Sequence, residues 1–186
     1  MPEGQDTIPK SLKKKGYVSH CVGKWHLGST RFKDLPVGKS WGFDQFVGLL
    51  HGAGGHYSKS ISNQDGFIVL SISILFFFKF QKKIKLKGLE GAFYDYSRAY
   101  SNGSFIPIHD DRHSTKSLTS EAIELIQNHP KEKPLFLYLA YTAAHTPLLA
   151  EKEWMEKCEH LKNPIRQAFC GLVVGADEGE FLFFFS

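Results

Sequence analysis

The chain has 186 residues, of which 42% are hydrophobic and 23% charged, and such globular-average values exclude wholesale disorder and collagen-like or coiled-coil structure. This length suits one domain, or a piece of a larger one, with a sizeable core. The formal net charge of +4 is modest and does not by itself indicate a nucleic-acid-binding protein.

The cysteines and the apolar runs narrow the class of protein further. Cys21, Cys158 and Cys170 cannot all pair within one chain and form no Cys-x-x-Cys motif, so we expect neither a disulfide framework nor a thiolate zinc site. The first residues lack the basic and apolar regions of a secretory signal. The most apolar run, 67–78, is shorter than the roughly twenty residues that span a bilayer, so no transmembrane helix is predicted.

The N-terminal third predicts a helix, a turn and a strand. Pro9 suits a first helical turn, and Gly16 suits the position that follows a helix. The β-branched and aromatic residues of 17–22 then predict a short strand. Residues 29–60 are rich in glycine, serine and aromatics without helical period, and we expect a long surface loop there. This loop would be ordered mainly by Trp41, Phe43 and Phe46.

Residues 64–88 differ in character from the rest of the chain. They contain a run of phenylalanine, isoleucine and leucine followed by a run of lysine, which is typical of a buried strand with a solvated basic edge. Because these residue types use A- and T-rich codons, translated non-coding sequence is the competing interpretation. The tail over 181–186 has a similar composition.

The C-terminal half has regular periodicity. A helix capped by Ser114 is predicted to end near Asn128, and a buried strand, covered on both faces, over 134–141. Two further helices are predicted near 151–161 and 165–177, the second with an apolar stripe and with Asn163 as its cap. Alternating helices and buried strands predict an α/β fold with a largely parallel sheet.

Polar side chains follow two of the predicted strands. Lys24 and His26 lie after the first, and His145 lies after the strand at 134–141. Ligands of open α/β sheets bind beyond the carboxyl ends of the strands, so these three residues could converge at one rim. An ammonium and two imidazoles suit a tetrahedral oxyanion, such as a sulfate or phosphate ester.

Other roles compete with this interpretation. A histidine at a strand end is more often structural than catalytic. Trp25 would be a core or wall residue, or would stack on a ring. The nine histidines include no His-Glu-x-x-His spacing, which disfavours a zinc hydrolase. The lysine runs suit solvated faces, so no nucleic-acid partner is expected. Asn102-Gly103-Ser104 fits a glycosylation sequon.

The segment Gly16-Tyr17-Val18-Ser19-His20-Cys21-Val22-Gly23-Lys24-Trp25-His26-Leu27-Gly28 resembles the type I sulfatases, and most of all the arylsulfatase B group. The pattern GY-x-(S/T)-x-x-x-GKWHLG is long and specific for that family. The resemblance continues through Trp41-Gly42-Phe43-Asp44, Tyr94-Asp95-Tyr96 and the helix at 114–126. It then includes the strand at 134–140, Ala144-His145-Thr146-Pro147, and the helix from Arg166 to Glu178.

The resemblance implies an alkaline-phosphatase-like α/β fold, with a mixed, largely parallel sheet and helices on both faces. It also implies hydrolysis of sulfate esters of aryl or sulfated-sugar substrates, with calcium and a formylglycine nucleophile as cofactors. By position, Lys24 would bind the sulfate, His26 would orient the nucleophile, and His145 would contact the sulfate and assist the leaving group. Family members usually work in lysosomes or outside the cell, often as glycoproteins.

The chain departs from the family pattern in its nucleophile and metal ligands. No cysteine lies in a Cys-x-Pro-x-Arg or Cys-x-Ala-x-Arg motif, and the early paired aspartates and the late Asp-Asn-Gly-Gly segment are absent. The chain is therefore expected to be a sulfatase fragment that is inactive alone. It would comprise a partial catalytic domain over 1–63, an atypical insertion over 64–88, the domain's continuation over 89–180, and an atypical tail over 181–186.

Two other functions remain open at this point. One is a non-catalytic sulfatase-like protein, or a pseudogene product, that binds an anion or a sulfated glycan without cleaving it. The other is a phosphoester hydrolase of the same superfamily, which the GKWHLG pattern disfavours.

Overall fold

The computed structural model of the chain describes residues 5–28, 35–52, 54–62 and 92–184. Its elements in chain order are α1 (Ile8–Lys13), β1 (Val18–Lys24), α2 (Gly38–Trp41), β2 (Gln45–Leu49), β3 (Ser60–Ser62), β4 (Ala92–Tyr94), β5 (Tyr96–Tyr100), β6 (Phe105–Pro107), α4 (Ser114–Gln127), β7 (Leu135–Ala140), α5 (Lys152–Glu156) and α6 (Pro164–Phe184). The strand or insertion predicted over 64–88 lies outside the described residues, as do the last two residues of the predicted tail.

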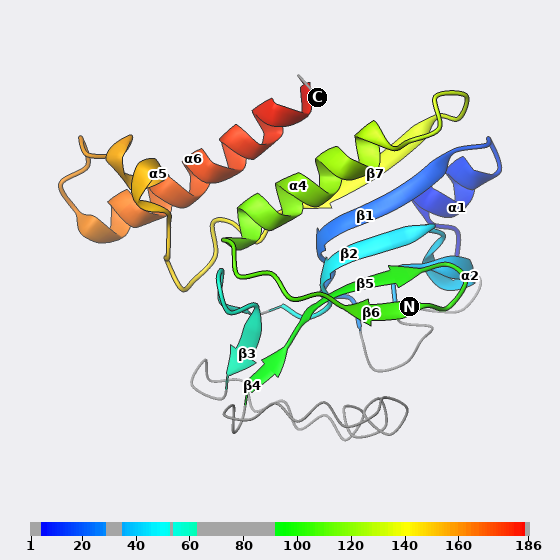
Figure 1. Cartoon of the computed structure of the whole chain (residues 1–186), viewed down its shortest axis with the longest axis horizontal. Helices are drawn as coiled ribbons and strands as arrows, with labels where there is room; N and C mark the ends of the chain where they lie inside the picture. The colour runs from blue at the N-terminus through cyan, green and yellow to red at the C-terminus, as the bar shows by residue number, and fades with distance from the viewer. Residues whose placement is uncertain (1–4, 29–34, 53, 63–91, 185–186) are drawn as a thin grey trace.

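The main sheet has five strands in the order β6-β5-β2-β1-β7, and β3 pairs with β4 in a second sheet. Strand β1 pairs in parallel with both β2 and β7, whereas β5 is antiparallel to β2 and β6. Helix α4 lies across one face of this sheet (Figure 1). The predicted mixed α/β sheet is confirmed, with its parallel part confined to the three strands β2, β1 and β7.

Successive residues of the central strands pack on opposite faces of the sheet. On one face, Val22 and Val47 pack with Leu118 and Ala122 of α4. On the other face, Cys21 and Phe46 pack in a second cluster, whose buried members also include Trp25, Leu35, Val37, Phe43, Leu50 and Ala99. Burial on both faces is the arrangement expected for parallel strands.

The surface loop predicted over 29–60 is wrong where the chain forms α2 and β2. Strand β2 lies at the centre of the sheet, and its Phe46 and Val47 are fully buried. It is five residues long and contains Gly48, which weakened its strand pattern. That glycine is needed because a Cβ atom at position 48 would lie 2.0 Å from the carbonyl oxygen of Gly23 on β1.

The N-terminal helix and strand agree with the sequence. The Thr7 hydroxyl accepts a hydrogen bond from the Lys10 amide at 3.4 Å, and Gly16 follows α1 with a φ of +83°. Strand β1 extends two residues beyond its predicted end at Val22, so Lys24 is its last residue.

Helix α4 and strand β7 depart from the prediction in detail. The cap of α4 is the His113 ring, which accepts from the Thr115 amide, and the predicted cap Ser114 lies inside the helix. Strand β7 is the last strand of the described sheet, and its Tyr138 is 46% exposed. The prediction that β7 is covered on both faces is therefore wrong, because an apolar run indicates burial but not the place of a strand in its sheet.

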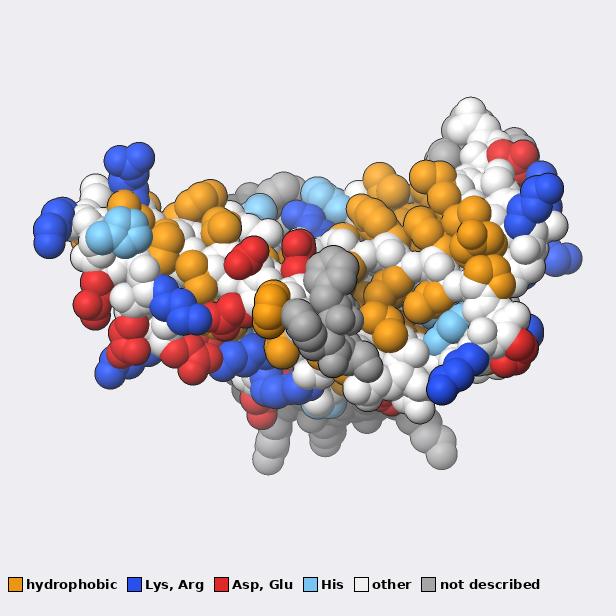
Figure 2. Space-filling view, turned by 90° about the horizontal axis from the view of Figure 1, so that it is seen from above, with side chains coloured by type: hydrophobic (Ala, Val, Ile, Leu, Met, Phe, Trp, Pro, Cys, Tyr) orange, Lys and Arg blue, Asp and Glu red, His pale blue; other side chains and the backbone are white. Residues whose placement is uncertain are grey.

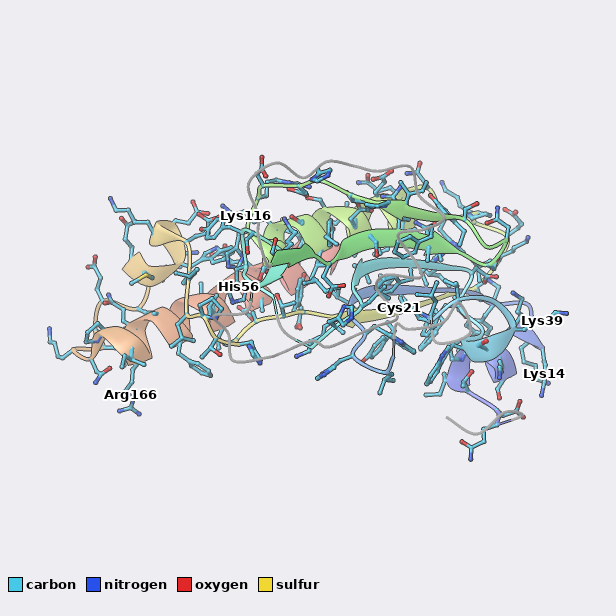
Figure 3. The ribbon with its side chains drawn as sticks, turned by 90° about the horizontal axis from the view of Figure 1, so that it is seen from below. Lys14, Cys21, Lys39, His56, Lys116 and Arg166 are labelled. Carbon is cyan, nitrogen blue, oxygen red and sulfur yellow. A yellow bond between two sulfur atoms is a disulfide. The ribbon has the colours of Figure 1, made fainter. Side chains whose placement is uncertain are left out.

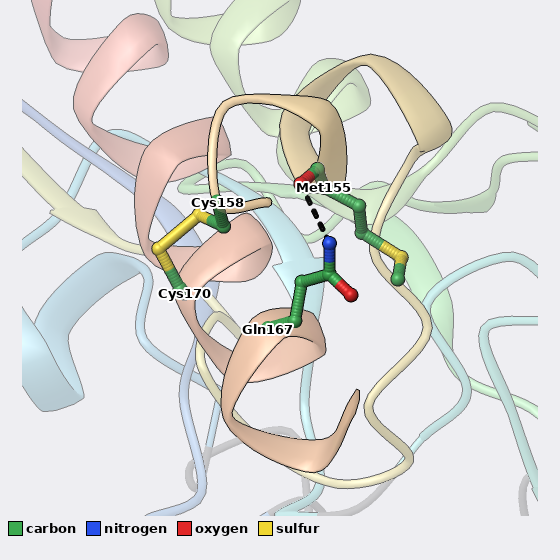
Figure 4. The surroundings of a disulfide bond; sticks show 4 residues. All are labelled: Met155, Cys158, Gln167 and Cys170. Atoms are coloured by element: carbon green, nitrogen blue, oxygen red, sulfur yellow. Dashed lines mark hydrogen bonds between the residues drawn. A yellow bond between two sulfur atoms is a disulfide. The ribbon is translucent and has the colours of Figure 1, made fainter. Parts of the chain in front are cut away.

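A disulfide that the sequence did not predict links the segment just after α5 to α6. Cys158 and Cys170 are bonded with an S–S distance of 2.06 Å, and beside them the Gln167 amide donates to the Met155 carbonyl (Figure 4). The expectation of no disulfide framework is thus wrong for this pair. Asn163 caps α6 as predicted, accepting from the amides of residues 165 and 166.

The apolar stripe predicted on α6 is only partly covered. Leu172 is fully buried, but about half or more of each of Ile165, Phe169 and Val173 is exposed. Seen from above, hydrophobic side chains gather in groups on the molecular surface (Figure 2).

Helix α6 continues to Phe184, beyond its predicted end, and α5 is shorter than predicted. None of the described helices combines the length and the apolarity needed to cross a membrane.

Candidate functional site

The carboxyl ends of the three parallel strands meet at one edge of the sheet, as their topology requires. Lys24 ends β1, His51 follows β2, and Thr142 and His145 follow β7. These four residues line one small pocket, together with Leu49, Gly52 and Gly54. The structure thus brings the predicted pair Lys24 and His145 to one site, although most of the chain separates them in sequence.

The segment that carries Lys24 is fixed by the backbone of β2. The Trp25 amide donates to the Leu49 carbonyl at 2.8 Å, and the His26 amide donates to the Leu50 carbonyl at 3.0 Å. Trp25 turns away from the pocket into the core, where it is 7% exposed and its ring packs edge-on against Trp41 at 4.5 Å. Of the roles considered for Trp25, the structure therefore supports the core role.

His26 lies beside the pocket. It has a φ of +54°, in the left-handed region, and its side chain is exposed. Its ring packs directly on Gly52, because a Cβ atom at position 52 would lie 2.1 Å from the His26 Cε1 atom. Since Gly52 lines the pocket, all three predicted site residues belong to one region of the surface.

The hydrogen bonding of His145 determines what its ring can offer. Its Nδ1 atom lies 2.6 Å from the Thr146 carbonyl oxygen, which can only accept, so Nδ1 carries a proton. Its Nε2 atom can therefore donate to an anion only when the ring holds both protons. In that state His145 is a cation that could later pass the Nε2 proton to a departing oxygen.

His51 and Asp95 form a pair that the sequence did not predict. The His51 Nδ1 atom lies 2.8 Å from one Asp95 oxygen, and the His51 amide donates to the other at 2.8 Å. Asp95 is 3% exposed; burial raises its pKa, and the N–H groups of His51 and Leu50 oppose that rise. An aspartate between two tyrosines in an apolar segment was the available signal for a buried carboxylate, but nothing in the sequence linked it to His51.

The pocket therefore combines an ammonium group with imidazoles, and the Asp95 carboxylate beside His51 is engaged by N–H donors. Such a set suits a compact oxyanion that accepts several charge-assisted hydrogen bonds. A sulfate or phosphate group offers the required negative charge and several acceptor oxygens.

The residues present do not fit the calcium and formylglycine that the resemblance implies. No three His, Cys, Asp or Glu side chains among the described residues are grouped to hold a metal ion. Cys21 is fully buried within the sheet (Figure 3), and burial raises the pKa of its thiol to about 12. The other two cysteines are joined in the disulfide. The described thiols therefore supply no precursor of the nucleophile at the pocket.

Two stacked histidines next to the site should make the fold sensitive to acid. Burial lowers the pKa of His56. Burial is also the main reason why the pKa of His113 falls from 6.5 to about 3. As the pH falls below 6.5, this histidine takes up a proton in the unfolded chain but not in the folded one. The stability of the fold that depends on the neutral ring is therefore complete above pH 6.5 and is lost progressively toward pH 3. At pH 5, His113 alone should account for a loss of about 1 to 2 kcal/mol.

Urea unfolding of the wild-type chain and of His113→Asn at pH 7 and pH 5 measures this loss. Asparagine retains a cap acceptor without the titrating ring. The stability difference between the two chains should therefore change with pH, and equal pH slopes would contradict the assignment.

Comparison with known proteins identifies similar chains. The Sulfatase family profile matches residues 1–179. The chain is 31% identical to arylsulfatase J of Mus musculus over 178 residues, which are 96% of this chain and 25% of that protein. It is 28% identical to N-acetylgalactosamine-6-sulfatase of Mus musculus over 160 residues, which are 83% of this chain and 25% of that protein.

Among solved structures, the chain is similar to Ps i-CgsB, determined in complex with k-i-k-neocarrahexaose. The two share 28% sequence identity with a TM-score of 0.67, over 95% of this chain and 35% of that one. The chain thus spans about a quarter of the length of the curated relatives it matches.

Proposed function

The chain belongs to the sulfatase family, and we propose that its pocket binds the sulfate group of a sulfate ester, as part of a sulfuric ester hydrolase of the arylsulfatase type. The observation that carries the proposal is that Lys24 and His145 line one pocket at the carboxyl edge of the parallel strands. Relatives named for arylsulfatase and N-acetylgalactosamine-6-sulfatase activity support an aryl sulfate or a sulfated sugar as the substrate class.

Each proposed residue has a distinct role. Lys24 presents a point charge with three donors to the sulfate oxygens. His145 donates from Nε2 to the anion when its ring holds both protons, and it then assists the departing oxygen. His26, which lies against Gly52, would orient the attacking group, as its position in the family motif implies.

We further propose that the 186-residue polypeptide binds sulfate esters without hydrolysing them by itself. Calcium and formylglycine supply charge neutralisation and nucleophilic attack on sulfur in the family, and the described residues of this chain fit neither group. A lysine and two histidines can hold the anion but do not replace a covalent nucleophile.

Binding of 4-nitrophenyl sulfate and of inorganic sulfate to the purified chain tests the site. Lys24→Ala should weaken binding about tenfold or more, because it removes charge-assisted hydrogen bonds. Lys39→Ala is the matched control, since it removes the same charge at a different place. Figure 3 shows Lys39 far from His56, whose ring is hydrogen-bonded to the His145 carbonyl beside the pocket. Equal affinities of wild type and Lys24→Ala would overturn the proposed site, and turnover by the wild type above the Lys24→Ala background would overturn the proposed inactivity.

A non-catalytic protein that binds a sulfated glycan is the second candidate, because the Cys21 thiol is buried and its pKa is raised to about 12. The transcript distinguishes the two. An upstream coding segment with a Cys-x-Pro-x-Arg motif favours the hydrolase, and a message that begins at Met1 favours the binding protein.

For the location of the protein we propose the lysosome or the extracellular space. The Cys158–Cys170 disulfide supports an oxidising compartment. Asn102 of the glycosylation sequon is exposed in the turn between β5 and β6, where a glycan would meet no obstacle from a buried backbone.

A further inference from the structure

His56 is a buried polar residue that does not itself line the pocket. It is 1% exposed and belongs to the segment between β2 and β3. Figure 3 shows it near the start of α4, at the end of the sheet from which α6 extends. A buried imidazole needs a partner for each ring nitrogen, so its hydrogen bonds define what it holds in place.

Both ring nitrogens of His56 are hydrogen-bonded. Its Nε2 atom lies 3.0 Å from the carbonyl oxygen of His145, and because a carbonyl only accepts, Nε2 carries the proton. Its Nδ1 atom lies 3.0 Å from the Ser114 hydroxyl, and burial, which lowers the pKa of His56, favours the neutral ring that accepts there.

The network continues from Ser114 to the pocket. With its own proton directed to His56, the Ser114 hydroxyl accepts from the Thr142 hydroxyl at 2.8 Å. Thr142 and His145 both line the pocket, and they begin and end the turn that follows β7. One buried imidazole is therefore connected to both ends of the turn that carries His145.

The His56 ring is itself firmly held. It stacks on the His113 ring with centroids 4.7 Å apart and an interplanar angle of 11°. The Ser114 amide also donates to the His56 carbonyl at 2.7 Å. His113, in contrast, directs its ring nitrogens to the Thr115 amide and to the Leu149 carbonyl, which lie outside this turn.

We propose that His56 is a positioning residue of the anion site, which fixes the turn over 142–145 so that His145 and Thr142 face the same anion as Lys24. The proposal rests on the sulfate-binding function proposed above. It predicts that affinity depends on a donor at the Nε2 position of residue 56, which holds His145, and on the Ser114 hydroxyl, which holds Thr142, and not merely on a filled space.

Two substitutions separate the two ring nitrogens. The amide nitrogen of glutamine extends to about the position of imidazole Nε2, whereas that of asparagine extends only to about the position of Nδ1. In sulfate titrations of the full chain, His56→Asn should weaken binding about fivefold or more, and His56→Gln should stay within about twofold of the wild type. His113→Asn, which alters the neighbouring buried ring, should also stay within about twofold.

A second readout follows the turn directly. In chains labelled with ¹⁵N-histidine, the imidazole signals of His145 should shift in His56→Asn and return toward the wild-type positions in His56→Gln. If His56→Asn fails to fold by circular dichroism, Ser114→Ala takes its place, because it breaks the link to Thr142 and leaves the ring intact.

The outcomes distinguish the two proposals. If Lys24→Ala weakens sulfate binding but His56→Asn or Ser114→Ala does not, the positioning role is wrong and the sulfate site stands. If the wild-type chain binds no sulfate, the proposed function fails, and unchanged His145 signals in the variants would then reject the positioning role as well. Similar loss in His56→Asn, His56→Gln and His113→Asn would indicate general packing and would also reject it.

Discussion

Replacement of Gly23 by alanine should destabilise the chain by about 4 kcal/mol, the largest effect we expect from a single substitution. Gly23 is the next-to-last residue of β1, the middle one of the three parallel strands, and it pairs with Gly48 of β2 and Ala140 of β7. A Cβ atom there would lie 1.9 Å from the Ala140 carbonyl oxygen. Because that atom belongs to the backbone, only separation of β1 from β7 would relieve the overlap.

The φ angle of +116° at Gly23 adds a conformational cost to the steric one. Gly16→Ala provides the matched control, since Gly16 also has a positive φ but meets no atom within 4 Å of an added Cβ. It should cost about 1 kcal/mol, the conformational cost alone. Urea unfolding of both variants measures the difference. Equal losses would show that the contact with β7 does not constrain residue 23.

Loss of the Cys158–Cys170 disulfide should lower the free energy of unfolding by about 3 kcal/mol. The bond links two cysteines that are 12 positions apart in sequence and restricts the unfolded chain accordingly. Other contacts between α5 and α6 remain, including the hydrogen bond from the Trp154 indole to Glu178 at 3.0 Å. We therefore expect a destabilised chain in which the main sheet persists.

The double variant Cys158→Ser, Cys170→Ser measures this effect in thermal and urea unfolding. A reducing agent should destabilise the wild-type chain by a similar amount and leave the variant unchanged, because Cys21 is buried and unpaired with another cysteine in both. A wild-type chain whose unfolding does not respond to reduction would contradict the prediction.

The sequence predicted the part of the site that lies directly at strand ends. Lys24, His26 and His145 follow segments whose strand pattern is local, so the common edge followed from topology alone. His51, Asp95 and His56 could not be found in this way. Their places near the pocket depend on hydrogen bonds between residues far apart in sequence, such as the 2.8 Å contact from His51 to Asp95.

The fold class was predictable from alternating helices and buried strands, but two strands were misjudged for physical reasons. In β2, Gly48 allows the backbones of β1 and β2 to lie close together. Because glycine has no side chain, it also weakens the sequence pattern that indicates a strand. In β7, the continuous apolar run has the composition of a central strand, although the strand lies at the edge of the described sheet. The disulfide was missed because pairing of cysteines depends on the packing of α5 on α6.

The order of the strands has a consequence for how the protein folds. Strand β7 pairs with β1, which lies near the N-terminus and is far from β7 in sequence. This pairing therefore has a high contact order and should form slowly. The pocket lined by Lys24, His51 and His145 forms only when β7 has brought its turn to β1 and β2. A ligand that binds there recognises only the completed sheet, so it would trap the native state and could serve as a folding reporter.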